Sequence, residues 1–181
     1  MSPSSSLLMP SFSDILSQYD YTLPDELIAK EPASPRDSAG LLVYDRVTKA
    51  HHITTFHDII AELPPQSVLV MNRTKVIPGK LTLTKATGGK MSALYLRTVN
   101  GTIIVLASGS FKKGDTLSWG DHHTFRVIDR KEKVAVLKPS FEISHLPSLL
   151  EQFGETPLPP YMKDSPMTEE RRRQEYQTVF A

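Results

Sequence analysis

The stretch that decides the fold is Met91–Ala107, MSALYLRTVNGTIIVLA. It contains two runs of β-branched, aliphatic and aromatic residues, Met91–Thr98 and Thr102–Ala107, on either side of Asn100-Gly101. The Asn-Gly dipeptide tolerates the positive φ angles of a type I′ turn. The stretch therefore predicts a tight antiparallel hairpin.

Similar short runs continue on both sides of this hairpin, separated by residues typical of turns. They are Ser67–Met71, Lys80–Lys85, Asp115–Trp119, Thr124–Asp129 and Lys133–Lys138. In Lys80–Lys85, KLTLTK, leucines alternate with threonines, so both leucines face the same side. Six or seven short strands with turns every roughly 8–12 residues predict a small β-barrel or sandwich over residues 66–145. Tyr95 and Trp119 are expected in its core rather than stacked on bases.

Helical and loop patterns flank this β-rich insert. Residues 19–31 predict a short helix that starts near Pro24, and Leu41–Asp45 with His51–Phe56 predict a hairpin. Leu146–Phe153 predicts a helix, and Thr168 is suited to cap another. We therefore expect a mixed α and β fold in which residues 19–65 and 146–181 form one domain around the insert. Residues 1–18 read as a flexible extension.

Composition narrows the classes of function. The 181 residues carry a net charge of +1, so any contact with nucleic acid must come from a local patch. The chain has no cysteine, which excludes disulfides and Cys-ligated metal sites and fits a reducing compartment. Its apolar runs are far shorter than a membrane span. The pairs His51-His52 and His122-His123 point to opposite faces of a strand, so we expect no metal site.

Three short motifs contain candidate binding residues, each with a structural alternative. Arg36 and Asp37, in PRDSAG, can bind a phosphate or carboxylate, or form a loop ion pair. Asn72, Thr74 and Lys75 follow a predicted strand, and the sequence leaves a ligand site and a solvated polar turn equally open. Gly88, Gly89 and Lys90 offer backbone N–H groups to a phosphate, but a hairpin turn is the favoured interpretation. The run Arg171–Arg173 favours a solvated helix face paired with Glu169 and Glu170 over an RNA contact.

Five blocks in order resemble one protein family. They are YDYTLPDELIAKEPASPRDSAGLLVYDR (19–46), VLVMNRTKVIPGKL (68–81), TGGKMSALYLR (87–97), TPLPPYMK (156–163) and EYQTVFA (175–181). They resemble the N-terminal half of the S-adenosylmethionine:tRNA ribosyltransferase-isomerases of queuosine biosynthesis. The resemblance covers residues 19–181.

The resemblance implies a fold and a reaction. The fold would be part of an α/β barrel-like domain, built from both ends of the chain, with an inserted small antiparallel β-barrel. The enzyme would transfer the ribosyl part of S-adenosylmethionine to the aminomethyl-deazaguanine wobble base of tRNA. It would isomerise the ribose to give epoxyqueuosine and release adenine and methionine. S-adenosylmethionine is then a co-substrate, no tightly bound cofactor or metal is expected, and the enzyme is expected in the cytoplasm.

The resemblance also implies the site residues. It adds Tyr161, Tyr176 and Gln177 to the substrate-binding candidates Arg36, Asp37, Asn72, Thr74, Lys75, Gly88, Gly89 and Lys90. It identifies no catalytic base. Three positions depart from the family pattern: Arg73 replaces an acid, Lys75 replaces an arginine, and Ser92 replaces a glutamate. An Arg-to-Lys change at a two-pronged contact is not conservative.

The apolar stretch EYQTVFA leads us to expect a chain that stops partway through a domain. The expected partners are the tRNA with its queuosine-type anticodon, S-adenosylmethionine, and either a complementary C-terminal half or a second copy. The alternative interpretation is a non-catalytic truncated relative, whose β-barrel binds RNA or protein.

Overall fold

The computed structural model describes residues 11–162 and 164–178. The chain divides into two units, residues 1–30 and residues 31–181. In the first unit, helix α1 (Phe12–Ser17) begins with a capping box between Ser11 and Asp14. The Ser11 hydroxyl accepts from the Asp14 backbone N–H at 3.2 Å, and the Asp14 carboxylate accepts from the Ser11 backbone N–H at 3.0 Å. A helical segment thus occupies part of the predicted extension 1–18, of which residues 1–10 lie outside the described residues.

The helix predicted over residues 19–31 is corrected to a single 3₁₀ turn, η1 (Asp25–Leu27). Pro24 precedes it with an extended backbone, at φ −63° and ψ 133°. Leu27 is 70% exposed. None of the three described residues of η1 is buried, and so short a helix is not stable on propensity alone.

The second unit starts with short elements around a hairpin. The 3₁₀ turn η2 (Arg36–Ser38) leads into β1 (Gly40–Tyr44), which pairs antiparallel with β2 (His51–Thr55). The 3₁₀ turn η3 (Phe56–Asp58) and helix α2 (Ile59–Glu62) follow. The predicted hairpin is confirmed.

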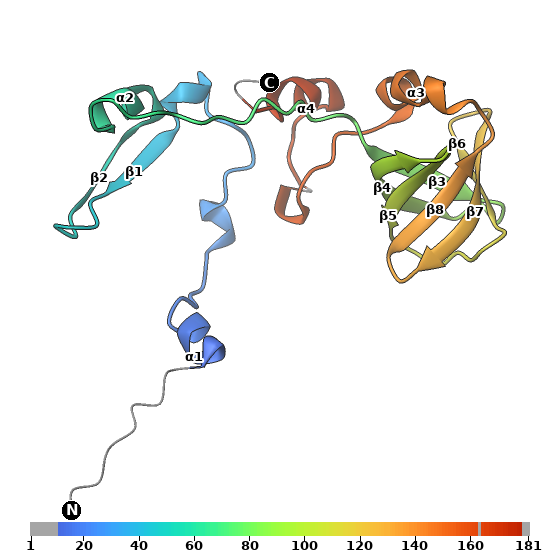
Figure 1. The fold of residues 1–181 in the computed structure, drawn as a ribbon, viewed down its shortest axis with the longest axis horizontal. Coiled ribbons are helices and arrows are strands. Elements are labelled where there is room, and N and C mark those ends of the chain that lie inside the picture. Colours follow the sequence, from blue (N-terminus) through green and yellow to red (C-terminus); the bar gives the residue numbers. More distant parts are fainter. Residues whose placement is uncertain (1–10, 163, 179–181) are drawn as a thin grey trace, which may run out of the picture. The chain divides into compact units, whose positions relative to one another are not determined.

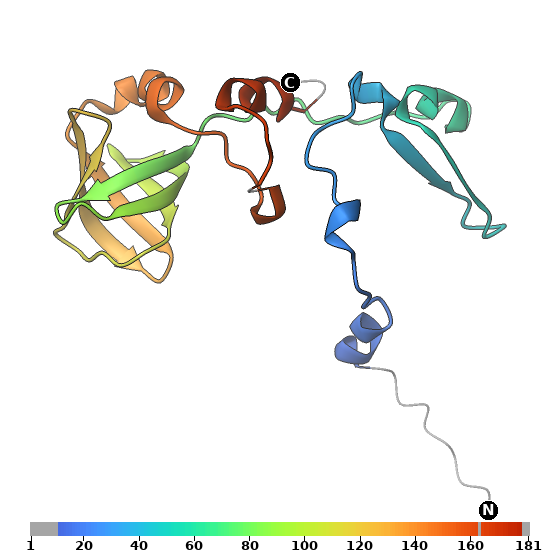
Figure 2. The same ribbon diagram turned by 180° about the vertical axis from the view of Figure 1, so that it is seen from behind.

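Residues 67–71, predicted as a strand, form none. They run in the extended segment that leads into the barrel, which Figure 2 shows entering β3 directly. Val68 is 87% exposed and Val70 is 91% exposed. The prediction of a strand here is wrong, because strand-forming composition does not supply a pairing partner and no described strand pairs with this segment.

Residues 80–139, all of them described, form a closed barrel of six antiparallel strands in the order β3-β4-β5-β8-β7-β6 (Figure 1). The strands are β3 (Lys80–Lys85), β4 (Lys90–Val99), β5 (Thr102–Ala107), β6 (Thr116–Trp119), β7 (His123–Lys131) and β8 (Val134–Pro139). Asn100 and Gly101 have φ angles of 47° and 72°, as the predicted β4–β5 turn requires. The mixed fold with an inserted antiparallel barrel is therefore confirmed.

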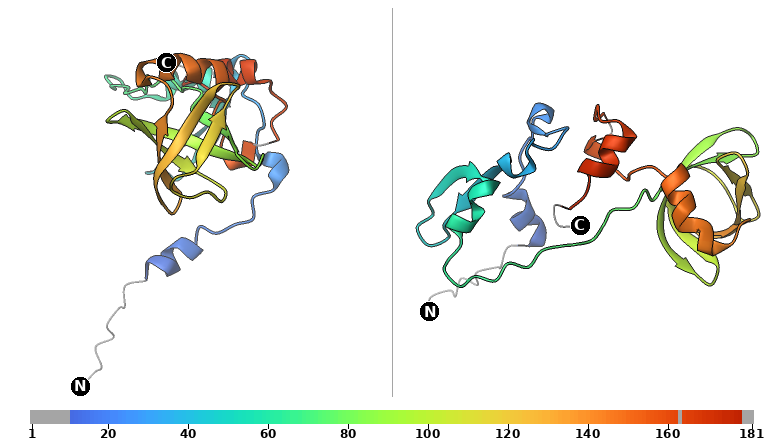
Figure 3. Two further views of the ribbon diagram at one scale, coloured as in Figure 1. Left: turned by 90° about the vertical axis from the view of Figure 1, so that its right-hand side faces the viewer. Right: turned by 90° about the horizontal axis from the view of Figure 1, so that it is seen from above.

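Alternating residues of every strand fill the barrel. Leu81 and Leu83 are fully buried, as the KLTLTK pattern predicts, and Trp119 is 1% exposed. The 3₁₀ turn η4 (Ile143–His145) and helix α3 (Leu146–Phe153) lie over one end of the barrel (Figure 3). Leu146, Leu149 and Leu150 complete the core there. Tyr95 packs against this core while only partly buried.

The chain then returns alongside the start of the barrel. Lys80 and Glu155 pair as an antiparallel bridge, and the 3₁₀ turn η5 (Pro160–Met162) precedes α4 (Glu169–Glu175). The Thr168 hydroxyl caps α4 by accepting from the Arg171 backbone N–H. The strands of the barrel lie inside the predicted 66–145 insert. The wider domain boundaries stay a prediction.

Candidate functional site

Two side chains, those of Gln177 and Thr178, hold the extended segment 72–78 against the end of α4. The Gln177 Oε1 atom accepts from the backbone N–H of Val76 at 2.8 Å, and its Nε2 atom donates to the Val76 carbonyl at 3.0 Å. Nε2 also donates to the Arg173 carbonyl at 3.0 Å. The Thr178 hydroxyl adds a longer contact of 3.4 Å to the Thr74 carbonyl. The amide of Gln177 therefore satisfies the two backbone groups of Val76 that a neighbouring strand would otherwise bind. In this structure Gln177 positions segment 72–78.

A small pocket of about 280 Å³ forms where this junction meets η2. Arg36, Val76, Glu175, Tyr176, Gln177 and Thr178 line it. The exposed Arg36 guanidinium has no hydrogen-bond or ion-pair partner among the described residues. Its charge is therefore available to an anionic ligand group. We call this set the Arg36–Tyr176 pocket.

Tyr176 has an unusual electrostatic environment in this pocket. Burial raises the pKa of its phenol above the ordinary value, and the electrostatic influence of Tyr161 adds to that rise. A phenol with a raised pKa keeps its proton at neutral pH. Tyr176 can therefore donate a hydrogen bond to a ligand but is poorly suited to remove a proton.

The other residues predicted from segment 72–75 lie beside this pocket. The Asn72 side chain accepts from the Thr74 backbone N–H at 2.8 Å, which fixes a local turn. Lys75 lines a neighbouring hollow of about 90 Å³ together with Glu151, Arg173 and Gln177. Asn72, Thr74 and Lys75 are all exposed. The turn interpretation thus holds for Asn72, while Lys75 remains available at the surface.

Asp37 follows Arg36 but has a partner of its own. Its Oδ2 atom lies 3.2 Å from Nδ1 of His57, on η3. Both side chains are more than half exposed, so this contact contributes little to stability. It does connect η2 with the turn that follows the hairpin, so Asp37 makes a local side-chain contact of the structural kind that the sequence left open.

Gly88, Gly89 and Lys90 form the β3–β4 turn instead. The backbone N–H of Gly88 donates to the Lys85 carbonyl, and Gly88 has a φ of 83°. Segment 72–78 leads into the other end of β3, about 20 Å away for a strand of this length. The structure therefore does not bring this motif to the Arg36–Tyr176 pocket, and the favoured hairpin-turn interpretation describes it.

Sequence reasoning missed the contacts that fix segment 72–78 to the barrel. A Cβ atom on Gly154 would lie 2.0 Å from the Pro78 carbonyl oxygen, so only glycine fits there. The next residue, Glu155, accepts from Lys80 Nζ at 2.7 Å and from the Thr82 hydroxyl at 2.6 Å. Burial alone would raise the pKa of Glu155, but these hydrogen bonds and the charges of Lys80 and Arg172 hold it below its ordinary value. The signal available in the sequence was Gly154 itself, read only as the end of a helix.

The side chains of Arg171–Arg173 form more hydrogen bonds and ion pairs than a solvated helix face would. Arg173 donates to the Glu151 and Gly154 carbonyls at 2.7 and 2.6 Å and forms the expected pair with Glu169 at 3.2 Å. Arg172 donates to the Ser165 carbonyl, and Arg171 pairs with Glu31. Arg172 and Arg173 therefore hold α4 against residues that precede it, and Arg171 connects α4 with Glu31 through an exposed ion pair.

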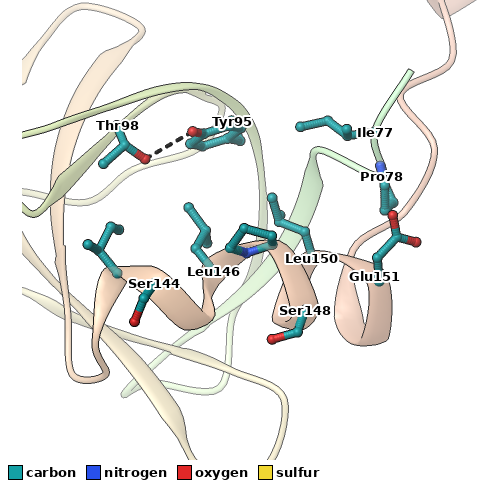
Figure 4. Close-up of a pocket in the computed structure, with 11 residues that line it drawn as sticks. Ile77, Pro78, Tyr95, Thr98, Ser144, Leu146, Ser148, Leu150 and Glu151 are labelled. Atoms are coloured by element: carbon teal, nitrogen blue, oxygen red, sulfur yellow. Dashed lines mark hydrogen bonds between the residues drawn. The ribbon is translucent and has the colours of Figure 1, made fainter. Parts of the chain in front are cut away.

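A larger apolar pocket of about 610 Å³ lies between α3, segment 77–78 and β4 (Figure 4). Leu146 and Leu150 point from α3 toward Tyr95, and the Tyr95 hydroxyl lies 2.9 Å from the Thr98 hydroxyl. Pro78 and Glu151 line both this pocket and the hollow beside Lys75. Its lining suits an apolar or aromatic group, but none of the predicted site residues lines it.

The described residues contain no group of three or more His, Cys, Asp or Glu side chains placed to hold a metal ion. In the same part of the chain, no helix is both long and apolar enough to cross a membrane.

Comparison with known proteins gives consistent matches. The family model described as "Queuosine biosynthesis protein" matches residues 16–181. The S-adenosylmethionine:tRNA ribosyltransferase-isomerase of Citrifermentans bemidjiense is 40% identical over 172 residues, which are 92% of this chain and 49% of that protein. The enzyme of the same name from Sulfurimonas denitrificans is 34% identical over 180 residues, which are 96% of this chain and 52% of that protein. The chain thus spans about half the length of these curated relatives.

A solved structure also matches. It is the S-adenosylmethionine tRNA ribosyltransferase of Thermotoga maritima, at 31% identity and a TM-score of 0.36. The match covers 75% of this chain and 48% of that one.

Proposed function

Because the chain belongs to the queuosine biosynthesis protein family, we propose that it supplies substrate-binding residues of a tRNA ribosyltransferase-isomerase. The proposed reaction transfers the ribosyl part of S-adenosylmethionine to the aminomethyl-deazaguanine wobble base of tRNA and isomerises it to epoxyqueuosine. Adenine and methionine are the other products, and we place the reaction in the cytoplasm.

The observation that carries the proposal is the convergence of three separate sequence blocks on one pocket. Arg36 comes from the first family-like block, Val76 from the second, and Tyr176 with Gln177 from the last. Packing alone does not explain this convergence. Arg36 is exposed and its side chain has no partner within the described residues, so it has no structural role there. Exposed polar residues gathered from distant segments are typical of a binding site.

Each of these residues has a proposed role. The Arg36 guanidinium binds the carboxylate of S-adenosylmethionine through two parallel hydrogen bonds. Tyr176 donates its phenolic proton to the same ligand, and Gln177 positions segment 72–78. Lys75 contacts a tRNA phosphate as a point charge. The reaction also needs a base that removes a proton from the ribose carbon beside the sulfonium. We assign that step to none of these four residues.

We further propose that the active protein includes a partner that covers the β1–β2 hairpin and segment 67–71. Ile53 is 78% exposed, and Val68 and Val70 are 87% and 91% exposed. Burial of these apolar side chains against another polypeptide would remove their surface from water. The partner is a chain carrying the remaining half of the family sequence or a second copy of this chain. Light scattering after gel filtration, with and without that half, separates the two.

A second candidate function is a non-catalytic module that binds RNA or protein through its barrel. The closed barrel supports it, because residues 80–139 enclose an apolar core without help from the hairpin. The two candidates differ in turnover. A module binds its ligand without releasing adenine.

The test is a product assay with S-adenosylmethionine and tRNA that carries the aminomethyl-deazaguanine precursor. The chain is assayed alone and with the remaining half of the family sequence, and adenine and modified nucleoside are measured by mass spectrometry. We expect both products when the two halves are combined, and their loss in Arg36→Ala. Folded protein that yields neither product in either arm would refute the proposed reaction.

A further inference from the structure

A hollow of about 500 Å³ lies on the outer wall of the barrel, away from the Arg36–Tyr176 pocket. We define the β4–β5 hollow by Ser92, Leu94, Leu106, Ser108, Arg130 and Lys133, which line it. Strands β4, β5 and β8 lie side by side there (Figure 1). Its volume falls within the range of small-ligand sites, about 300–1,000 Å³.

Apolar side chains form the floor of the β4–β5 hollow. Ala93 pairs with Ala107 across β4 and β5, and both point into the core. Because side chains alternate along a strand, the next pair, Leu94 and Leu106, faces outward. Leu106 is 41% exposed, as is Val134, its partner on β8. The outer wall therefore carries an apolar row where a solvated barrel normally carries polar residues.

Two cations stand at the rim of this floor, and no carboxylate lines the hollow. The Arg130 guanidinium donates to the carbonyls of Gly109, Phe111 and Glu132 at 2.8 to 3.0 Å. It also lies 3.9 Å from the centroid of the Phe111 ring. All these partners are neutral, so the charge of Arg130 is fixed in place and uncompensated. Lys133 is exposed, and its ammonium group has no partner within the described residues.

Hydroxyl groups complete the rim. The Ser108 backbone N–H and hydroxyl both donate to the Ser92 carbonyl, at 2.9 and 3.2 Å. These bonds fix the residues after β5 against β4. Among the described residues the Ser92 hydroxyl has no hydrogen-bond partner, so it can donate to a ligand oxygen.

We propose that the β4–β5 hollow binds one nucleotide unit of an RNA strand. Lys133 and the Ser92 hydroxyl contact the phosphodiester, Arg130 contributes its fixed charge, and Leu94 and Leu106 lie under the adjoining ribose or base. The combination of an apolar floor with an uncompensated cationic rim matches a nucleotide, which is apolar on the faces of its base and anionic at its phosphate. The proposal rests on the proposed function, because RNA is the substrate of that reaction.

The test measures RNA affinity without turnover. The probe is a fluorescein-labelled RNA of the anticodon stem and loop, titrated by anisotropy over a series of KCl concentrations. Lys133→Ala removes one phosphate contact, so we expect roughly three- to tenfold weaker binding at low salt and a salt slope smaller by about 1. Leu106→Ser should weaken binding without changing the slope, because the floor contributes no charge.

The matched control is Lys138→Ala, an exposed lysine near the other end of β8. It should change neither affinity nor slope, and circular dichroism should show the same fold for all variants. An unchanged salt slope in Lys133→Ala would overturn the proposal. So would displacement of the RNA by inorganic phosphate as readily as by a mononucleotide, which indicates a simple anion site. Lys133-dependent binding of an acidic peptide with no Lys133-dependent binding of RNA would assign the hollow to a protein instead.

These results separate the hollow from the proposed reaction. Lys133-dependent RNA binding without product would refute the reaction and leave the hollow as an RNA site. Product formation with RNA binding that is independent of Lys133 would leave the reaction and refute this site.

Discussion

Gln177 forms two hydrogen bonds with the backbone of Val76, a residue 101 positions earlier in the chain: its Oε1 accepts from the Val76 N–H at 2.8 Å and its Nε2 donates to the Val76 carbonyl at 3.0 Å. An extended segment normally satisfies these two groups with a neighbouring strand. One amide side chain replaces that strand here. Gln177 therefore makes the shorter of the described contacts that place segment 72–78 beside the residues after α4, and with them the Arg36–Tyr176 pocket.

Replacing Gln177 should release segment 72–78. Gln177→Ala leaves the partly buried N–H and carbonyl of Val76 without protein partners, at a cost of about 1–3 kcal/mol for local opening. We expect hydrogen exchange at the Val76 amide to speed up by roughly five- to hundredfold, since about 1.4 kcal/mol corresponds to a factor of ten. Gln174→Ala, at an exposed position in α4, is the control. Equal protection of Val76 in both variants would show that the amide does not hold the segment.

Gly154 should be intolerant of any side chain. The Cβ atom of Gly154→Ala would lie 2.0 Å from the Pro78 carbonyl oxygen and 2.5 Å from that of Leu150. Both are backbone atoms that cannot rotate away, so we expect a loss of about 2–3 kcal/mol in the free energy of unfolding. Gly40→Ala has nothing within 4 Å of the added Cβ and serves as control. Urea unfolding of the two variants checks this, and a stable Gly154→Ala would mean that the two segments do not approach so closely.

Glu155 should make stability depend on pH in the acid range. Its pKa lies below the ordinary value of 4.5 in the folded chain, because Lys80 and Thr82 stabilise the carboxylate more than burial disfavours it. A lowered folded pKa gives stability that is present above the unfolded pKa and lost as pH falls through the folded one. Glu155→Gln should therefore be less stable than the parent protein at pH 7, and the gap should close below about pH 4.5.

The measurement is urea unfolding of both proteins at several pH values from 7 down to 3. Glu132→Gln, at an exposed position in the β7–β8 turn, controls for the change of net charge. A gap between Glu155→Gln and the parent that stays constant across the range would contradict the assignment of the pH dependence to this carboxylate.

The barrel was predictable because its local signals agree with its pairing. The Asn100-Gly101 dipeptide favours a tight turn, and the alternation in Lys80–Lys85 favours one buried face, so the hairpin and the shared face of Leu81 and Leu83 follow from the sequence. Leu146–Phe153 ends at Gly154, as its sequence indicates. In these elements the turn, strand and helix-end signals lie within the element itself, so they can be recognised without knowing the distant parts of the fold.

The errors lie where pairing partners are distant or absent. Ser67–Met71 has strand-forming residues, yet no described strand pairs with it, and propensity cannot supply a partner. The segment around Leu27 has a helical pattern, but none of the described residues Asp25–Leu27 is buried. Tertiary context decides both outcomes.

The same distinction applies to the candidate site. The resemblance placed Arg36, Tyr176 and Gln177 on the list of binding residues, and the structure brings these three to one pocket. It leaves Gly88–Lys90 at a distant turn, because β3 separates them from segment 72–78. Motifs could not predict the structural roles of Gln177 and Gly154, because both roles depend on contacts with residues more than 70 positions away in the chain.

The most direct measurement is the affinity of the protein for S-adenosylmethionine, compared with that of Arg36→Ala and Arg36→Lys by equilibrium dialysis. Arg36 has no structural partner among the described residues, so its removal should leave the fold intact. We predict roughly ten- to hundredfold weaker binding in Arg36→Ala, because a charge-assisted contact contributes about 1.5–3 kcal/mol. We expect only partial recovery in Arg36→Lys, which lacks the two-pronged geometry. Equal affinity in all three proteins would contradict the assignment of the Arg36–Tyr176 pocket as the substrate site.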